Sequence, residues 1–300
     1  MIIAIGEILF DIFPNYRRIG GAPFNFAFHL KNFGIPVRFI TRVGRDAEGE
    51  EICGLLSDSG FDLTDVQIDD HHPTGRVQVE LDDKGVPQFD IISDVAYDYI
   101  QLTDSLQTTL QREVDLIYFG TLVQRSPTGF RTLQDVLSRK RRRTRGLYDV
   151  NLRPKCYSKP VLLNSLIQTD LVKLNREELA LIRAMLNYEG EADNFVGHLM
   201  QAYALKLLAL TKGEDGNELF TPTGHHAAPA VTPRKIADTV GAGDAFAAVF
   251  AAGYLEMWEP EEILQRAADF AARICEIEGA IPSDASFYVD GIDRGARHAQ

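Results

Sequence analysis

The residues with the clearest chemical potential lie between Asp238 and Asp244, where two carboxylates flank small residues and the apolar segment Ala245–Gly253 follows. Gly241 and Gly243 leave the backbone free to turn sharply, so that several N–H groups converge at the start of a helix. Such a turn binds anions, because unpaired amides and the helix dipole point at one place. Asp244 at its edge suits a general base that faces a transferred phosphoryl group. The alternative is an Asp that only caps a helix after a glycine turn.

A second glycine turn, Gly20-Gly21-Ala22-Pro23, stands near the start of the chain, and Asn25 follows it in the first turn of an expected helix. Asn25 is either a helix cap or a polar contact to a ligand. Asp11 lies in the otherwise apolar stretch 8–13. It is either an exposed strand acid or a carboxylate that accepts hydrogen bonds from a polyol.

Polar side chains also follow an expected strand over residues 146–150. Asp149, Asn151 and Arg153 alternate with apolar residues, and period-2 alternation predicts that they share one side of the chain. Arg153 then either faces a phosphate or a sugar oxygen, or forms a salt bridge within its loop.

Two further strand ends carry candidate ligand contacts. Asn175 and Glu178 open a helix after the strand 170–174, and they either form a capping box or hold a hydrated Mg²⁺ near nucleotide phosphates. The stretch Thr211-Lys212-Gly213, continued to Gly216, ends the strand 207–211 and is a candidate edge for a nucleotide.

Strands and helices alternate along most of the chain. Expected strands cover residues 2–5, 37–44, 115–119, 146–150, 170–174 and 207–211, and expected helices cover 26–33, 47–59, 128–139, 176–186, 245–254 and 260–277. This order predicts a doubly wound α/β sheet with ligands at the carboxyl ends of its strands.

The pattern changes between residues 74 and 92, where Val77, Val79 and Leu81 alternate with polar residues and Asp83-Lys84-Gly85 makes a turn. A hairpin with one solvated face is indicated. We interpret it as part of a small β lid inserted into the core, joined by the stretch 8–13, so that lid strands occupy about residues 8–19 and 74–98 of a single domain spanning 1–300.

Composition excludes several classes of protein. The 300 residues carry a net charge of −12, which argues against nucleic acid or an anionic membrane as partner. The three cysteines are far apart and form no C-x-x-C pair, so a reducing, cytoplasmic setting is expected. The N-terminus lacks the features of a signal peptide. Neither a G-x-x-x-x-G-K-[ST] loop nor a G-x-G-x-x-G turn after the first strand occurs.

Three of these motifs, taken in order, resemble the ribokinase/PfkB-like carbohydrate kinases: Gly20-Gly21-Ala22-Pro23-x-Asn25, Asn175-x-x-Glu178 and Asp238-Thr239-x-Gly241-Ala242-Gly243-Asp244. The resemblance covers nearly the whole chain. It implies a three-layer α/β/α sandwich with a mostly parallel central sheet and a small β lid that closes over the sugar.

The resemblance also implies roles for individual residues. Asp244 would be the base that takes a proton from the attacking sugar hydroxyl, with anion-binding amides from Gly241, Ala242 and Gly243. The sugar would contact Asp11, Gly21 and Asn25, with Gly20 and Arg153 as further candidates. Mg²⁺ and the phosphates of ATP would lie at Asn175 and Glu178, and the nucleotide edge at Thr211, Lys212, Gly213 and Gly216. Asp238 matches a position near a monovalent-cation site that many members use, for which K⁺ is the candidate ion, with carbonyls partly from Gly279-Ala280-Ile281-Pro282-Ser283.

Within the family, Gly21-Ala22-Pro23 before Asn25 and Asp149-x-Asn151-Leu152-Arg153 look most like fructokinases, as does Gly279-Ala280-Ile281-Pro282. Phe24, Phe26 and Phe28 are bulkier than the residues usual after that turn, and either tighten the sugar pocket or fill the core. Alternatives are a kinase for a ribosyl compound or for 2-keto-3-deoxygluconate, and a catalytically silent sugar-binding regulator. A homodimer formed through the lid is a further hypothesis.

Overall fold

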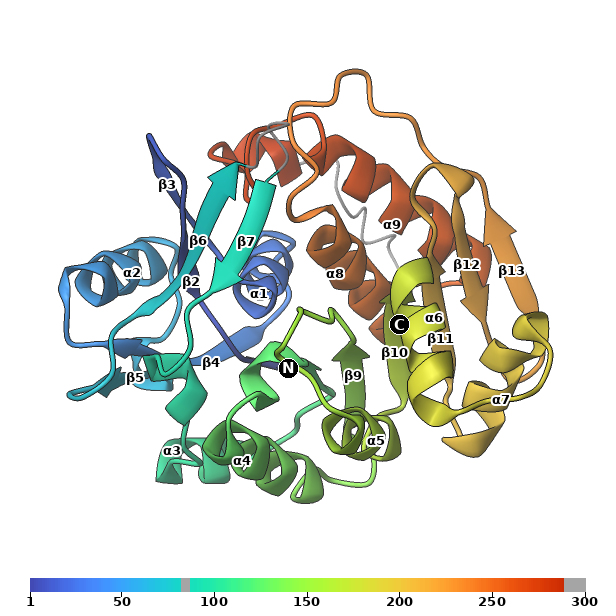
Figure 1. The fold of residues 1–300 in the computed structure, drawn as a ribbon, viewed down its shortest axis with the longest axis horizontal. Helices are drawn as coiled ribbons and strands as arrows, with labels where there is room; N and C mark the ends of the chain where they lie inside the picture. Colours follow the sequence, from blue (N-terminus) through green and yellow to red (C-terminus); the bar gives the residue numbers. More distant parts are fainter. Residues whose placement is uncertain (82–86, 289–300) are drawn as a thin grey trace, which may run out of the picture.

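The computed structural model describes residues 1–81 and 87–288 and contains a nine-stranded sheet (Figure 1). In spatial order its strands are β13 (His225–Ala228), β12 (Asn217–Phe220), β11 (Leu207–Thr211), β10 (Leu171–Asn175), β9 (Arg145–Asp149), β8 (Leu116–Gly120), β1 (Ile2–Ile5), β4 (Val37–Gly44) and β5 (Val66–Asp69). Neighbours from β11 to β5 pair in parallel, whereas β12 and β13 are antiparallel additions at one edge.

Helices cover both faces of this sheet, as Figure 1 shows. One layer holds α1 (Ala22–Asn32), α2 (Ala47–Asp58), α8 (Ala242–Leu255) and α9 (Pro260–Ile274), and the other holds α3 (Asp104–Leu110), α4 (Pro127–Ser138), α5 (Lys159–Ile167), α6 (Arg176–Leu186) and α7 (Phe195–Ala202). Each layer buries its own hydrophobic cluster against the strands. The expected three-layer α/β/α sandwich is confirmed.

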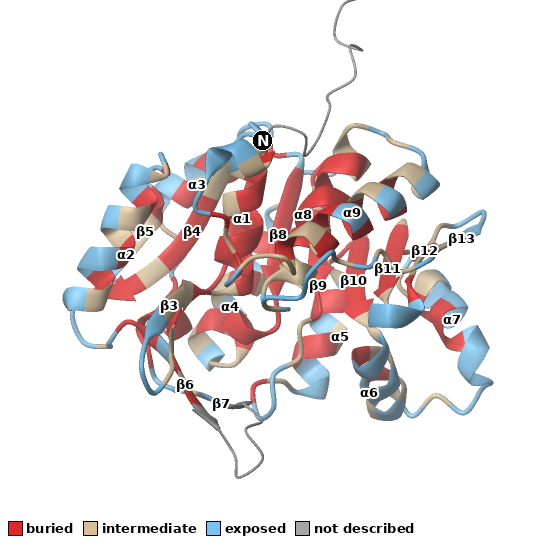
Figure 2. Cartoon of the chain, turned by 90° about the horizontal axis from the view of Figure 1, so that it is seen from above, coloured by how far each residue is buried: buried red, intermediate tan, exposed pale blue. Residues whose placement is uncertain are grey.

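The two clusters follow from the pleat of the strands. Successive side chains of a strand point to opposite faces, so Ile2 and Ala4 of β1 join the cluster beneath α8, while Ile3 and Ile5 join the cluster on the other face. Figure 2 shows the buried residues concentrated in the strands and on the inward sides of the helices. A strand buried on both faces needs the continuous apolar run seen in the sequence.

A smaller, separate sheet has the order β3 (Arg17–Gly20), β2 (Leu9–Ile12), β6 (Gly75–Leu81) and β7 (Pro87–Ile91). Its strands come from the two stretches that were expected to form a lid. The predicted turn Asp83-Lys84-Gly85 lies outside the described residues.

The order of the strands reverses at β1, which pairs with β4 on one side and with β8 on the other. At such a reversal the loops leaving neighbouring strands diverge, and a crevice opens at the carboxyl ends of the strands.

Several expectations differ from the structure. Helix α8 begins at Ala242 and α1 at Ala22, each about one turn earlier than expected, because the small residues before each apolar run already belong to the helix. Strand β5 and the helices α3, α5 and α7 were not expected. These are short elements, and short elements carry weak periodic signals. No helix in the described part of the chain is long and apolar enough to cross a membrane.

Candidate functional site

A cleft of about 1160 Å³ lies where the carboxyl ends of β1, β9, β10 and β11 meet the small sheet. Its walls therefore come from elements far apart in the sequence. Most of the predicted site residues line it: Asp11, Gly20, Gly21, Asn25, Arg153, Asn175, Glu178, Thr211, Gly241, Gly243 and Asp244.

The turn that opens α8 forms one wall. Gly241 precedes the helix with φ 81°, a left-handed conformation that glycine adopts without strain. A Cβ there would lie 2.3 Å from the Cβ of Ala280, so the turn also needs glycine for space. The Ala242 N–H donates to the carbonyl of Thr239 at 3.4 Å, and no side chain in the described residues caps the helix. The amides of Gly243 and Asp244, in the first turn, are therefore the better anion donors.

Asp244 is held by a residue from the other glycine turn. The side-chain amide of Asn25 donates to Oδ2 of Asp244 at 2.7 Å, although the two residues stand 219 positions apart. Asn25 is only 3% exposed, and its own Oδ1 has no hydrogen-bond partner among the described residues. Asn25 thus orients the Asp244 carboxylate and keeps an acceptor free at the cleft wall.

The charge of Asp244 is balanced between opposing neighbours. Burial, followed by the negative charge of Asp149, raises its pKa, whereas the hydrogen bond from Asn25 and the charges of Lys173 and Arg153 lower it, and the net shift is upward. A carboxyl group with a raised pKa is a stronger proton acceptor once it is ionised. The environment of Asp244 is that of a candidate general base.

Two more carboxyl groups line the cleft beside Asp244. Burial raises the pKa of Asp11 to about 6, against the charges of Arg153 and Arg18. A Cβ on Gly20 would lie 2.8 Å from Oδ2 of Asp11, so glycine leaves room for that carboxylate. Burial likewise raises the pKa of Glu7 to about 7. Glu7 is 3% exposed, and its Oε2 has no hydrogen-bond partner in the described chain.

The alternation predicted past β9 is wrong. Asn151 has φ 39°, so the chain leaves the extended conformation there. Asp149 lies within β9, before this change, and it is 0% exposed and pairs with Lys173. Asn151 and Arg153 line the cleft instead. Arg153 is exposed, and no salt bridge of its guanidinium occurs among the described residues.

Asn175 and Glu178 form the predicted capping box. The Glu178 N–H donates to Oδ1 of Asn175 at 2.8 Å, and Oε2 of Glu178 accepts the Asn175 N–H at 2.8 Å. Oε1 of Glu178 also accepts the N–H of Leu152 at 2.9 Å. Both residues still line the cleft. Their oxygens keep lone pairs for water molecules, which fits a hydrated Mg²⁺ better than a directly bound one.

The remaining predicted residues lie away from the cleft lining. Lys212 pairs with Glu218, and its N–H donates to the carbonyl of Gly216 at 2.9 Å. Gly213 begins a short 3₁₀ turn between these residues. This tight turn joins β11 to β12, and its role at the nucleotide edge stays a prediction.

Asp238 is engaged by the small sheet. Its Oδ2 accepts Nη1 of Arg18 at 2.8 Å and the Gly279 N–H at 3.2 Å, and its Oδ1 accepts the Val240 N–H at 3.1 Å. A guanidinium therefore already neutralises the carboxylate that was expected near a monovalent cation. This arrangement does not fit K⁺ bound to Asp238.

Comparison with known proteins decides the family. The sequence pattern of the pfkB family carbohydrate kinases matches residues 15–286. The chain belongs to the PfkB family of carbohydrate kinases.

Individual relatives agree with this assignment. A sugar kinase of Pyrococcus horikoshii is 28% identical over 275 residues, covering 86% of this chain and 83% of the relative. Its ATP complex superposes with a TM-score of 0.77 at 26% identity, covering 93% of this chain and 94% of that one. A 5-dehydro-2-deoxygluconokinase of Clostridium tetani is 23% identical over 302 residues, with 91% and 86% covered. A fructokinase of Xylella fastidiosa with bound ATP has a TM-score of 0.81 at 21% identity, with 93% of each chain covered.

The bulky residues that depart from the PfkB pattern fill the core. Phe24 and Phe26 are fully buried in the cluster beneath α1, and Phe28 packs against that cluster. Phe26 stacks on Tyr118 with ring centroids 3.7 Å apart. None of the three phenylalanines is among the described residues that line the cleft.

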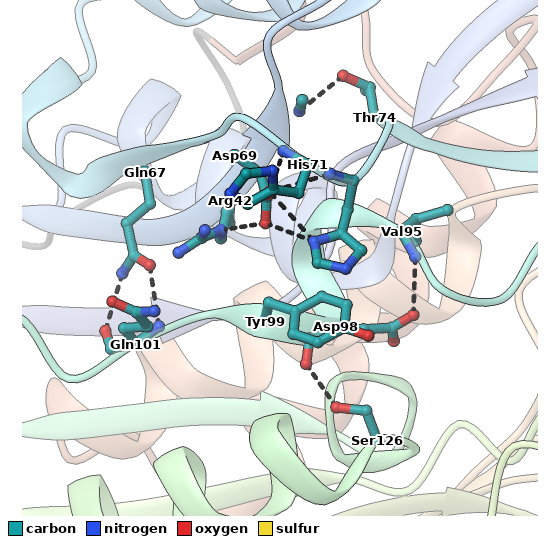
Figure 3. A network of polar contacts seen from close by, with 12 residues as sticks. Arg42, Gln67, Asp69, His71, Thr74, Val95, Asp98, Tyr99, Gln101 and Ser126 are labelled. Atoms are coloured by element: carbon teal, nitrogen blue, oxygen red, sulfur yellow. Dashed lines mark hydrogen bonds and ion pairs between the residues drawn. The ribbon is translucent and has the colours of Figure 1, made fainter.

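The small sheet of this carbohydrate kinase is anchored at its base by a polar network, shown in Figure 3. The Asp69 carboxylate accepts Nε of Arg42 at 2.7 Å and the His71 N–H at 2.8 Å. Further along, Asp98 pairs with Nε of Arg125 at 2.7 Å, and Arg125 lines the cleft. The segment before the hairpin β6–β7 is thus fixed to β4, and the segment after it to the chain that follows β8.

Sequence reasoning missed Glu7 and Lys173, both of which line the cleft of the kinase. Each carried a signal. Glu7 directly follows a buried strand and a glycine, and Lys173 interrupts an apolar strand, Leu171-Val172-Lys173-Leu174. A charged residue at or beside a buried strand needs a partner, and such buried charges are frequent at functional sites.

Proposed function

We propose that this carbohydrate kinase transfers the γ-phosphate of ATP to a primary hydroxyl of a small keto sugar, with fructose as the first candidate. The observation that carries the proposal is the hydrogen bond between Asn25 and Asp244. It joins the sugar-facing turn to the anion turn within one cleft, so that a base and an anion site face the same substrate.

The reaction would be a direct displacement at phosphorus. Asp244 accepts the proton of the sugar hydroxyl as that oxygen attacks the γ-phosphorus, and the bond from the γ-phosphorus to the bridging oxygen of ADP breaks. The amides of Gly243 and Asp244 stabilise the charge on the transferred group. Glu178 and Asn175 would hold Mg²⁺ through water, which supplies positive charge to the phosphates.

The cleft offers groups suited to a polyol. Asn25 and Glu7 each keep a buried oxygen without a partner in the described chain, and Asp11 stands beside them. Buried polar atoms require partners, and sugar hydroxyls can both donate and accept. Phe89 of β7 is 57% exposed and faces the same cleft. It supports the proposal that the small sheet closes over a bound sugar and excludes water.

A sugar acid is the second candidate. Arg153 brings an exposed guanidinium without a salt bridge among the described residues to the cleft, and guanidinium groups bind carboxylates in bidentate fashion. The Clostridium tetani relative is named for a substrate of this class, 5-dehydro-2-deoxygluconate. 2-Keto-3-deoxygluconate belongs to the same class.

A screen of ADP release would test the proposal. Fructose, ribose, 5-dehydro-2-deoxygluconate and 2-keto-3-deoxygluconate would be compared at equal concentration, with a sugar-free reaction as control. We expect the highest kcat/KM for fructose. A higher value for either acid, lost in Arg153→Gln, would select the second candidate. Binding of a sugar without ATP consumption would show a silent regulator instead.

We also propose a homodimer formed through the small sheet. Tyr16 and Ile92 expose apolar surface on or beside its strands and lie outside the cleft lining, and clustered apolar surface favours protein contacts. Light scattering of the purified chain, compared with Ile92→Ser, would test this hypothesis.

A further inference from the structure

A lysine–aspartate pair is buried in the main sheet directly below the proposed reaction site. Lys173 of β10 and Asp149 of β9 are register partners on neighbouring parallel strands. Nζ of Lys173 lies 3.1 Å and 3.4 Å from the two carboxylate oxygens of Asp149. Lys173 is 7% exposed and Asp149 is 0% exposed.

The position of the pair is fixed from below. Tyr118 of β8 donates its hydroxyl to Oδ2 of Asp149 at 3.0 Å, and the ring of Tyr118 stacks on Phe26 of α1. The aromatic contact and the hydrogen bond together leave Asp149 little freedom to rotate. Lys173 is therefore clamped at a defined place.

That place is the underside of the anion turn. A Cβ added to Gly243 would lie 3.0 Å from Nζ of Lys173, so the ammonium packs against the first turn of α8. Lys173 also lines the cleft. An ammonium has three donors, and its only hydrogen-bond acceptor among the described residues is Asp149.

Stability alone does not account for the pair. Desolvation of two charges offsets their attraction, and apolar residues of similar volume are often as stable in such a place. A buried charge that faces an anion site has a use that an apolar residue lacks.

We propose that Lys173 is a positioning residue of this kinase. Its ammonium, clamped by Asp149 beneath the first turn of α8, supplies a fixed positive charge that positions Asp244 and the transferred phosphoryl group. The inference rests on the proposed function.

The charges around Asp244 make the inference specific. Asp149 raises the pKa of Asp244, and Lys173 lowers it. Removing each partner alone should therefore move this pKa in opposite directions. The groups that face Asp244 come from β1, β2, α1, β8, β9 and β10 with their following loops: Glu7, Asp11, Asn25, Tyr118, Asp149, Arg153 and Lys173.

The test compares Lys173→Met, Asp149→Asn and the double variant, in which no unpaired charge remains. We expect the midpoint of the acid limb of the kcat/KM profile to move about 1 pH unit upward in Lys173→Met and about 1 pH unit downward in Asp149→Asn. A shift of about 1 unit is at the lower end of what a neighbouring charge causes. The double variant should keep the limb near its original place. It should still lose about 10- to 100-fold in kcat with little change in KM, because the positive charge is gone.

Lys140→Met is the matched control. Lys140 pairs with Asp170 at 3.3 Å. Asp170 directly precedes β10, at the end of that strand that lies opposite the cleft. It should lower thermal stability without moving the pH profile.

A second readout is independent of turnover. The ¹³C-carboxyl resonance of Asp244, assigned by its loss in Asp244→Asn, would be titrated in each variant. Opposite shifts in the two single variants support the inference, and no shift, or shifts in one direction, overturn it. Opposite shifts in a protein that phosphorylates no sugar would refute the proposed function while leaving the placement of the charge intact. Normal sugar kinase activity in all variants would refute only the inference.

Discussion

Gly241→Ala tests whether the geometry of the anion turn, rather than its composition, is what the reaction needs. The new methyl group would lie 2.3 Å from Cβ of Ala280, whereas ordinary contact begins at 3.4 Å. Either the turn or the segment around Ala280 must therefore move by about 1 Å, and a misplacement of that size costs on the order of 10²-fold in rate. The φ of 81° at Gly241 adds about 1–2 kcal/mol of strain for a residue with a Cβ.

We expect kcat of Gly241→Ala to fall about 100-fold while the protein remains folded by circular dichroism. Gly54→Ala is the matched control. Gly54 lies within α2, and a Cβ there meets nothing within 4 Å, so the same substitution should raise stability by about 0.5–1 kcal/mol and leave kcat unchanged. The assay is coupled ADP release at saturating sugar and ATP. A Gly241→Ala enzyme with the kcat of the wild type would refute the reasoning.

Three more outcomes are expected. Asp244→Asn can keep its contact with Asn25 through the amide oxygen, so it should stay folded and lose about 10²–10⁴-fold in kcat; turnover near that of the wild type would exclude Asp244 as the base. The pKa of Glu7 is raised by burial to about 7, so the folded state loses stability as pH rises from about 4.5 through 7. The free energy of unfolding of Glu7→Gln, measured by urea denaturation, should therefore exceed that of the wild type by about 3 kcal/mol at pH 8 and by little at pH 4. An equal gain at both pH values would contradict this. Because Arg18 neutralises Asp238, the wild type should turn over equally in potassium chloride and in choline chloride at one ionic strength. The turnover of Arg18→Gln should fall about 10-fold in choline chloride and recover in potassium chloride, and its melting temperature should likewise be lower in choline and recover in potassium. A wild type that requires K⁺ for turnover would show that the Arg18 guanidinium does not take the place of the cation.

Periodicity was sufficient for the strands and helices that carry strong patterns. Helix 176–186 and strands 37–44 and 207–211 coincide with α6, β4 and β11. The helix follows the cap Asn175, the first strand ends at Gly44, and the second is an apolar run between two lysines. The start of α8 was misjudged because Gly241 and Gly243, on either side of Ala242, indicate a turn rather than a helix.

The contents of the site were only partly predictable. Motifs gave the residues of the two glycine turns, but the hydrogen bond between Asn25 and Asp244 depends on tertiary packing. The left-handed conformation of Asn151 ends the alternation of β9 before Arg153, and no local pattern indicates such a conformation. The pairing of Asp238 with Arg18 depends on the position of β3, which the sequence does not reveal.

The bond between Asn25 and Asp244 also has a consequence for how the chain is made. Its partners are 219 positions apart, and such non-local contacts form late, because a long loop must close before they bring any gain. A domain folds as a unit, and α1, which carries Asn25, shares its hydrophobic cluster with α8. A nascent chain that ends before Ala242 therefore lacks both the proposed general base and the helix that covers this face of the main sheet. We expect the activity to arise only when synthesis is nearly complete.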